Sequence, residues 1–288
     1  MSVFKNSGKI SIQEKVLSFL YKTSSGRILL KILIRPEISA AAGKFMDSRL
    51  SIPIIKPFIR YNNIDMSQFE NCRYNSFNEF FTRKIKPECR KIDMDKKALI
   101  SPCDGKLSVF DICDNSRFMI KGSEYSVSEL FQSKRAIEKY RGGKCLIFRL
   151  SVDDYHRYCY IDNGEKTGNR YIPGEFHTVN PIACESCDIY KRNSREYTIM
   201  RTENFGDTAE IEVGAMLVGR IRNNAGAGKM VKGEEKGRFE YGGSTIILMF
   251  EKDKIELDGE IADRAKKGEI QVRYGQKIGQ SVDQSVFT

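Results

Sequence analysis

The chain has 288 residues, of which 40% are hydrophobic, and its formal net charge is +10 at pH 7. This length is enough for one large domain, or for a catalytic domain with a smaller appendage. The composition excludes a collagen-like, low-complexity or wholly disordered protein. The positive charge suits a polyanionic partner, either nucleic acid or an anionic membrane surface, and it suits plain solubility equally well.

The cysteines are scattered along the chain and indicate reduced thiols. Only Cys184 and Cys187 have CxxC spacing, and neither a second CxxC pair nor paired histidines completes a zinc site, so we expect no metal. The first residues, MSVFKNSGKISIQEK, lack the apolar segment and the cleavage site of a secretory signal. The apolar run ILLKILI at 28–34 is too short to span a membrane.

Residues 10–60 are predicted to form basic amphipathic helices with a break at 24–26. Apolar residues recur at helical spacing on both sides of this break, at Ile12, Val16, Phe19 and Leu20 and again at Ile28, Leu29, Ile32 and Leu33. Lysines and arginines surround them. Such helices either lie in a membrane interface or pack on their own domain with a solvated basic rim.

From about residue 98 the chain consists of β-branched runs divided by Gly, Asp and Asn, with one short helix expected in SVSELFQS. Typical runs are KCLIFRLSV, TAEIEVGAMLVGRI and TIILMFEKDKIEL. We therefore predict an α+β fold. Basic amphipathic N-terminal helices in a segment at 1–65 precede a β-rich catalytic domain at 66–288 that resembles a sandwich or barrel.

Three reactive side chains lie at the ends of predicted strands. Asp104 lies in the turn SPCDG, His156 follows KCLIFRLSV, and Ser244 begins the last strong strand. Such residues can meet as orienter, base and nucleophile, although spacing alone does not establish a triad. Gly242 and Gly243 either form an ordinary turn into the strand or allow the strained backbone that a reaction at the Gly243 carbonyl needs.

Seven segments of the chain, in order, resemble the phosphatidylserine decarboxylases. They are FNEFFTRKIKPECR (77–90), SPCDGKL (101–107), IKGSEYSVSELF (120–131), LSVDDYHRY (150–158), IPGEFHTVNPIA (172–183), FGDTAEIEVGAMLVGRI (205–221) and KGEEKGRFEYGGSTIILMF (232–250). The resemblance covers most of the chain and implies a carboxy-lyase that acts on phosphatidylserine.

The resemblance also implies how the enzyme makes its own cofactor. Ser244 attacks the Gly243 carbonyl, and elimination and hydrolysis leave a β-chain of residues 1–243 and an α-chain of residues 244–288 that begins with a pyruvoyl group. This group forms an imine with phosphatidylserine and accepts the electron pair as CO2 leaves, which yields phosphatidylethanolamine. It replaces PLP, so no diffusible cofactor is expected.

The resemblance assigns roles to further residues and leaves others open. His156 would be the base for Ser244, and Asp104 would hold its imidazole. Many family members have a second histidine where this chain has Cys159. Either His156 serves both self-cleavage and decarboxylation, which we favour, or His177 takes part, or Cys159 acts itself; Cys159 is also readily explained as a small buried residue.

Three more residues have a weaker assignment. Thr245 either assists at the cleavage site or is simply a strand former, which we favour. Lys121 and Tyr125, in the segment KGSEY, resemble a substrate-side segment of the family, although a solvated loop explains them almost equally well.

The implied partners are the phosphatidylserine substrate and an anionic membrane surface, which the basic N-terminal helices would contact. We expect a peripheral enzyme on the cytoplasmic face of the cell membrane, with the β-chain and α-chain held together and no nucleic acid bound. The oligomeric state is left open, a homodimer included. The alternatives are a pyruvoyl-dependent decarboxylase of a soluble amino acid, a basic β-rich RNA-binding protein, and a relic that folds without cleaving itself.

Overall fold

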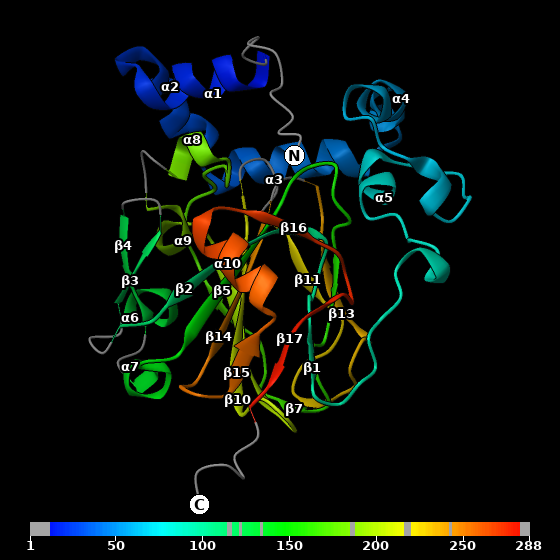
Figure 1. The fold of residues 1–288 in the computed structure, drawn as a ribbon. Coiled ribbons are helices and arrows are strands. Elements are labelled where there is room, and N and C mark those ends of the chain that lie inside the picture. Colours follow the sequence, from blue (N-terminus) through cyan, green and yellow to red (C-terminus); the bar gives the residue numbers. More distant parts are fainter. Residues whose placement is uncertain are drawn as a thin grey trace, which may run out of the picture.

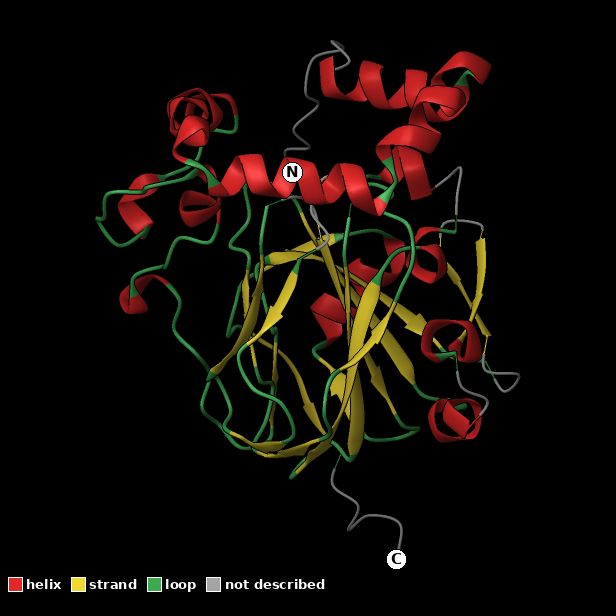
Figure 2. Ribbon diagram, turned by 180° about the vertical axis from the view of Figure 1, so that it is seen from behind, coloured by secondary structure: helices red, strands yellow, loops and turns green. Residues whose placement is uncertain are grey.

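The structure is a computed structural model that describes residues 12–113, 117–120, 123–132, 135–184, 188–215, 220–241 and 244–282. Helices dominate its N-terminal part and strands the rest, so the predicted α+β class is confirmed. Figures 1 and 2 show the N-terminal helices lying across one end of the β-rich body. The first five α-helices are α1 (Ile12–Lys22), α2 (Ser24–Leu33), α3 (Pro36–Asp47), α4 (Ile52–Tyr61) and α5 (Phe77–Phe81).

Capping residues determine where these helices begin. Thr23 is the N-cap of α2, and its side chain accepts a hydrogen bond from the Gly26 N–H at 3.0 Å. Pro36 occupies the first turn of α3, where its fixed φ suits the helix and its missing N–H costs nothing. The predicted break at 24–26 is therefore wrong in position: the chain breaks at Thr23, and those three residues form the first turn of α2.

The largest sheet has nine antiparallel strands in the order β12-β7-β9-β10-β14-β5-β2-β16, with β8 also paired to β9. We call it the main sheet. Its strands are β2 (Gly105–Asp111), β5 (Lys144–Leu150), β7 (Gly164–Lys166), β8 (Arg170–Ile172), β9 (Arg195–Thr202), β10 (Asp207–Val213), β12 (Gly228–Met230), β14 (Ser244–Phe250) and β16 (Ile270–Val272).

Smaller sheets and short helices complete the body. The sheet β11-β13-β6 comprises Ile221–Asn223, Glu235–Phe239 and Arg157–Cys159, and the sheet β1-β17-β15 comprises Ala98–Ile100, Lys277–Ser281 and Ile255–Leu257. Strands β3 (Arg117–Ile120) and β4 (Ser123–Ser126) pair antiparallel. The remaining helices are α6 (Val127–Phe131), α7 (Arg135–Tyr140), α8 (Pro181–Cys184), α9 (Ile189–Arg192) and α10 (Gly259–Lys267). Helix α6 confirms the short helix expected in SVSELFQS.

Strand β14 lies in the middle of the main sheet and is buried on both faces. Ile247 and Met249 join a core cluster with residues of α1, α2 and α6, whereas Ile246 and Leu248 join a second cluster with residues of the smaller sheets. Burial on both faces explains why this strand is a continuous apolar run and not an alternating one. Each large apolar side chain that is fully buried stabilises the fold by about 1.5–3 kcal/mol.

The N-terminal helices pack on the body with one face and leave another face exposed. Leu17, Leu20 and Leu30 are buried in the first core cluster, whereas Ile28 is 69% exposed and Val16 51% exposed. The packed arrangement foreseen for these helices is therefore present, and it leaves apolar surface uncovered. None of the helices in the described ranges is long and apolar enough to cross a membrane.

Candidate active site

The predicted reactive residues lie at or near the ends of neighbouring strands, at one edge of the main sheet. Strand β2 begins directly after Asp104, β5 ends at Leu150 shortly before His156, β14 begins at Ser244, and β10 ends at Val213. Because neighbouring strands are antiparallel, these four ends fall on the same edge. The register places Ser244 directly opposite Leu150.

Ser244 is buried at 2% exposure, and its Oγ has no hydrogen-bond partner among the described residues. The hydroxyl of Thr245 is likewise buried without a partner in that part of the chain, and it faces the opposite side of β14. A buried hydroxyl without a partner costs about 1–3 kcal/mol. Gly242 and Gly243 lie outside the described residues, so the structure describes Ser244 but not the bond before it.

His156 is fully buried, and its ring orientation is fixed by the backbone of Asp154. Nδ1 lies 2.9 Å from the Asp154 carbonyl oxygen. Because a carbonyl oxygen can only accept, Nδ1 carries the proton in the neutral ring and Nε2 is the nitrogen that can take up another. This tautomer suits a general base.

Two contacts place His156 beside the segment that leads to Ser244. The Phe239 N–H donates to the His156 carbonyl oxygen at 2.9 Å. The Phe81 ring lies 4.1 Å from the His156 ring and 5.4 Å from the Tyr241 ring, measured between centroids. His156 and Tyr241 therefore share an aromatic neighbour on α5.

The Asp104 carboxylate contacts other groups than the one we predicted. It accepts hydrogen bonds from Arg90, at 2.8 Å from Nε and 2.5 Å from Nη2, and from the Tyr274 N–H at 2.8 Å. His156 Nδ1 contacts the Asp154 backbone, where we had expected Asp104 to hold the ring. The catalytic role of Asp104 stays a prediction.

Asp154 is a residue of this edge to which the sequence analysis gave no role. Its carboxylate accepts hydrogen bonds from the Ser151 N–H at 2.7 Å and from Gln271 Nε2 at 3.3 Å. Burial raises the pKa of this carboxyl to about 6. The double acid in DDYHR, directly before the histidine, is the signal in the sequence that could have identified it.

The structure places the two accessory candidates in different settings. Burial raises the pKa of the Cys159 thiol to about 12, so the side chain is neutral at physiological pH, which favours the small buried residue over a nucleophilic thiolate. His177 lies against α1, with Nδ1 at 3.1 Å from the Tyr21 hydroxyl and Nε2 at 3.0 Å from Glu175 Oε2. Burial lowers the pKa of His177. Its Nδ1 contacts α1 through Tyr21, whereas its Nε2 contacts Glu175 in the loop after β8.

The remaining predicted residues are distributed as follows. Tyr125 is buried in the first core cluster, where its ring lies 5.7 Å from that of Tyr190, so it is a core residue and not part of a solvated loop. Lys121, Cys187 and the side chain of Cys184 lie outside the described part of the chain.

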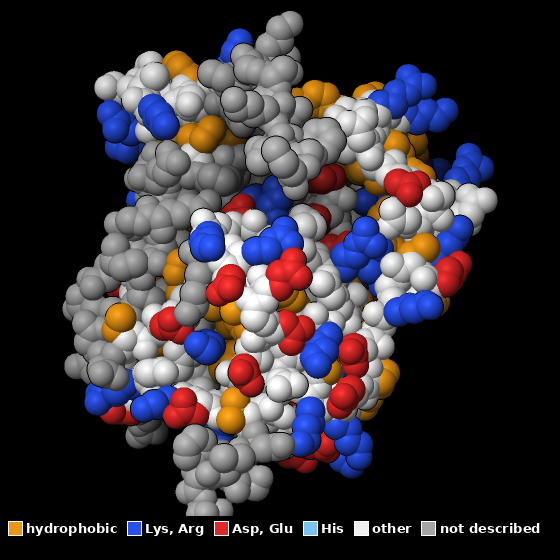
Figure 3. Space-filling model, in the orientation of Figure 1, with side chains coloured by type: hydrophobic (Ala, Val, Ile, Leu, Met, Phe, Trp, Pro, Cys, Tyr) orange, Lys and Arg blue, Asp and Glu red, His pale blue; other side chains and the backbone are white. Residues whose placement is uncertain are grey.

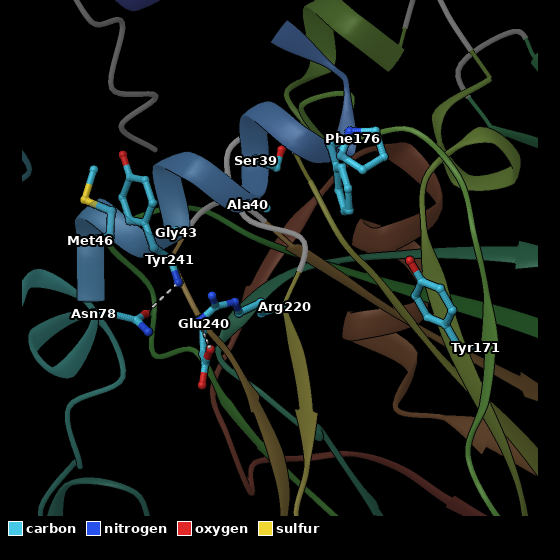
Figure 4. A pocket seen from close by; sticks show the side chains of 11 residues that line it. Ser39, Ala40, Gly43, Met46, Asn78, Tyr171, Phe176, Arg220, Glu240 and Tyr241 are labelled. Carbon is cyan, nitrogen blue, oxygen red and sulfur yellow. Dashed lines mark hydrogen bonds and ion pairs between the residues drawn. The ribbon is translucent and has the colours of Figure 1, made fainter. Parts of the chain in front are cut away.

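A cavity of about 170 Å³ lies between α3 and this sheet edge (Figure 4). It is lined by Pro36, Ser39, Ala40, Gly43, Met46, Asn78, Tyr171, Phe176, Arg220, Glu240 and Tyr241. The Tyr241 N–H donates to Asn78 Oδ1 at 3.1 Å, which holds Tyr241, three residues before Ser244, against α5. Ser39 Oγ is buried and has no hydrogen-bond partner within the described ranges. The cavity therefore adjoins the predicted cleavage site and offers both apolar and polar walls.

Comparison with known proteins confirms the resemblance inferred from the sequence. The family model for phosphatidylserine decarboxylase matches residues 77–280. Phosphatidylserine decarboxylase proenzyme 2 of Clostridium acetobutylicum is 45% identical over 269 residues, which cover 93% of this chain and 92% of that protein. The phosphatidylserine decarboxylase proenzymes of Ruminiclostridium cellulolyticum and Clostridium tetani are 42% and 43% identical, and each match covers at least 92% of both chains. Together with the Asp, His and Ser residues at one sheet edge, these matches show that the chain belongs to the phosphatidylserine decarboxylase family.

Proposed function

We propose that this chain decarboxylates phosphatidylserine to phosphatidylethanolamine after converting its own Ser244 into a pyruvoyl group. The observation that carries this proposal is the Ser244 hydroxyl, which is buried, has no partner in the described residues, and lies at the first position of β14 after Gly243. The names of the relatives, all proenzymes of this decarboxylase, support it.

The residues present fit a pyruvoyl group at this position. Conversion of Ser244 removes its hydroxyl and its backbone N–H and leaves two carbonyl groups, so the buried donor without a partner disappears. When formed, the group supplies an adjacent ketone that accepts the electron pair released with CO2. The cavity beside Tyr241 would receive the serine head group of the substrate.

The self-cleavage can be written with the residues of this chain. Ser244 Oγ bonds to the Gly243 carbonyl carbon as the C–N bond breaks, and its proton passes through His156 Nε2 to the freed amine. Loss of the Cα proton and of the ester oxygen then leaves a dehydroalanine and a carboxylate on Gly243. Water replaces the amino group, and ammonia leaves. The tautomer fixed by Asp154 supports His156 as the base.

We also propose that the helical end of the molecule rests on an anionic membrane at the cytoplasmic face. Its exposed apolar side chains are Val16, Phe19, Ile28, Leu29, Ile32, Phe45, Leu50 and Ile52. Figure 3 shows hydrophobic and basic side chains together at this end. Each Lys or Arg near such a surface contributes about 1 kcal/mol. The cavity lies at the same end, beneath α3, so a lipid head group would have a short path to it.

The first experiment is the intact mass of the purified protein under denaturing conditions. We expect two chains split after Gly243, the smaller lighter by one ammonia than its sequence requires, and a single full-length chain for Ser244→Ala. The wild-type protein should then release CO2 from phosphatidylserine vesicles and not from free serine. A single wild-type chain would contradict the self-cleavage, and activity on serine would favour the soluble amino-acid decarboxylase. The homodimer stays open.

A further inference from the structure

Three arginines surround Glu240, shortly before the predicted cleavage site. We call Arg220, Arg222, Arg238 and Glu240 the arginine cluster. The Glu240 carboxylate lies 3.5 Å from Arg220 Nη1, 3.3 Å from Arg222 Nε and 3.6 Å from Arg238 Nη2. The side chain of Glu240 is 11% exposed, whereas those of Arg220, Arg222 and Arg238 are 39%, 56% and 32% exposed. The guanidinium groups therefore reach solvent while the acid between them is buried.

Arg220 connects this cluster to the cavity beneath α3. Among the described residues that line the cavity, Arg220 is the one with a positive charge (Figure 4). Its Nη1 also contacts Asp47 Oδ2 on α3 at 2.6 Å, and Asp47 Oδ1 in turn accepts a hydrogen bond from Asn78 at 2.8 Å. Among the described residues, three guanidinium groups thus face two carboxylates, so positive charges outnumber negative ones by one.

We propose that the arginine cluster, with Arg220 at the cavity, binds the phosphodiester of the phospholipid substrate; this inference rests on the proposed function. A phosphodiester carries one negative charge, which matches the excess of one positive charge among these residues. The planar guanidinium group donates two parallel hydrogen bonds to phosphate oxygens. Glu240 and Tyr241 lead directly to Ser244, so a phosphate held here keeps the serine head group near the reacting position.

The substrate carries a second anion, its carboxylate, and the chemistry argues against that group as the ligand. Decarboxylation removes negative charge from the carboxylate, so a cation on it would stabilise the ground state more than the transition state and slow the reaction. The charge of the phosphodiester is the same in both states. Arg220 should therefore lower KM and leave kcat unaffected.

Asp47 competes with the substrate for Arg220. Its Oδ2 lies 2.6 Å from Arg220 Nη1, and its side chain is 39% exposed, so a phosphate can reach the same nitrogen and displace it. Asp47→Asn removes this competing charge and keeps the cation. Arg220→Gln removes the cation and breaks the same ion pair. The two variants therefore separate phosphate binding from the structural link between Arg220 and α3.

The test is the kinetics of CO2 release from a soluble short-chain phosphatidylserine below its micelle concentration, so that membrane attachment does not contribute. We expect Arg220→Gln to raise KM about tenfold or more at unchanged kcat. Arg220→Lys keeps the positive charge and should show a smaller rise in KM, and Asp47→Asn should leave KM unchanged or lower it. Lys252→Gln, an exposed lysine in the turn after β14, is the control for net charge. Inhibition by a short-chain phosphatidylethanolamine, which keeps the phosphodiester and lacks the carboxylate, should weaken in Arg220→Gln by the same factor as KM.

The outcomes distinguish this inference from the proposed function. If the wild-type protein cleaves itself and decarboxylates the lipid but Arg220→Gln has an unchanged KM, the arginine cluster is not the phosphate site. If Asp47→Asn raises KM as much as Arg220→Gln does, Arg220 acts only through α3. If inhibition by phosphatidylethanolamine is unchanged in Arg220→Gln, the ligand is the carboxylate. If the wild-type protein does not act on phosphatidylserine at all, the proposed function itself fails.

Discussion

Lys236→Met is expected to destabilise the protein by about 3–5 kcal/mol at pH 7, because it removes one partner of a buried ion pair. Lys236 in β13 is fully buried, and its Nζ bonds Glu212 Oε1 and lies 3.5 Å from Glu210 Oε1. Burial opposes the charge of Lys236, but the two carboxylates outweigh it and raise its pKa, so the ammonium group stays charged. Methionine fills a similar volume and leaves both buried carboxylates without the cation that pairs with them, since Lys166 forms no ion pair with either one among the described residues and acts on them only electrostatically.

The loss of stability should depend on pH in a definite direction. Burial raises the pKa of Glu212 from 4.5 to about 7 and also raises the pKa of Glu210, and removal of Lys236 raises both further. The folded state then binds more protons than the unfolded state. A carboxyl whose pKa is higher in the folded state than in the unfolded state lowers the stability of the protein as the pH rises from the unfolded-state pKa to the folded-state pKa. The effect of Lys236→Met should therefore be largest above pH 7 and should shrink toward pH 5.

The measurement is urea unfolding followed by far-UV circular dichroism, since the chain has no tryptophan. Ser244→Ala serves as the background, so that a single uncleaved chain unfolds. Lys236→Met combined with Glu212→Gln should recover most of the loss, because removing both members of a buried pair is close to neutral. Lys252→Met, at an exposed lysine, should change stability by no more than about 0.5 kcal/mol. A loss below about 1 kcal/mol, or one that is equal at pH 5 and pH 8, would refute the reasoning.

Three further predictions concern the sheet edge and the helices. His156→Gln should slow self-cleavage at least 100-fold, as expected for loss of a general base, whereas Cys159→Ser should cleave normally. The time course of the intact mass checks both variants, and rapid cleavage of His156→Gln would exclude His156 as the base. Burial raises the pKa of Asp154 from 3.8 to about 6, so ionisation of this carboxyl lowers the stability of the protein as the pH rises through that interval. Asp154→Asn should therefore make the urea midpoint depend less on pH between pH 4 and 6. Phe19→Ser combined with Ile32→Ser should weaken co-sedimentation with anionic vesicles without changing CO2 release from soluble short-chain phosphatidylserine. Unchanged co-sedimentation would contradict the membrane proposal.

Local signals in the sequence predicted much of this architecture. The apolar run after Ser244 predicted β14, and the change of pattern near residue 98 predicted where the strands begin. The reactive residues were found because each lies at a strand end, and antiparallel pairing then brings those ends together. Helix α2 shows the limit of such signals: Ser24 and Gly26 suggested a break, but the hydroxyl of Thr23 caps a helix that contains both.

Contacts between distant segments could not be predicted in the same way. The pairing of Asp104 with Arg90 depends on how the segment before β1 folds back, which no local pattern encodes. Glu210 and Glu212 alternate with apolar residues along β10, as solvent-facing side chains do, yet both are buried against Lys236 of β13, in the sheet β11-β13-β6. The arginine cluster likewise forms only because β11 and β13 are paired, with Arg222 opposite Arg238.

The position of Ser244 in the sheet also bears on how a two-chain enzyme would stay together. Ser244 is the first residue of β14, and every residue of that strand from Ser244 to Phe250 is paired with β5, while Thr245 to Met249 are paired with β10. A cut before Ser244 therefore breaks one covalent bond and leaves the pairing of Thr245–Phe250 with β5 and of Thr245–Met249 with β10 unchanged. Because both neighbouring strands belong to the proposed β-chain, the new end of the α-chain would stay fixed at the sheet edge, near the residues that we propose for the cleavage. We expect the two chains to separate only on denaturation.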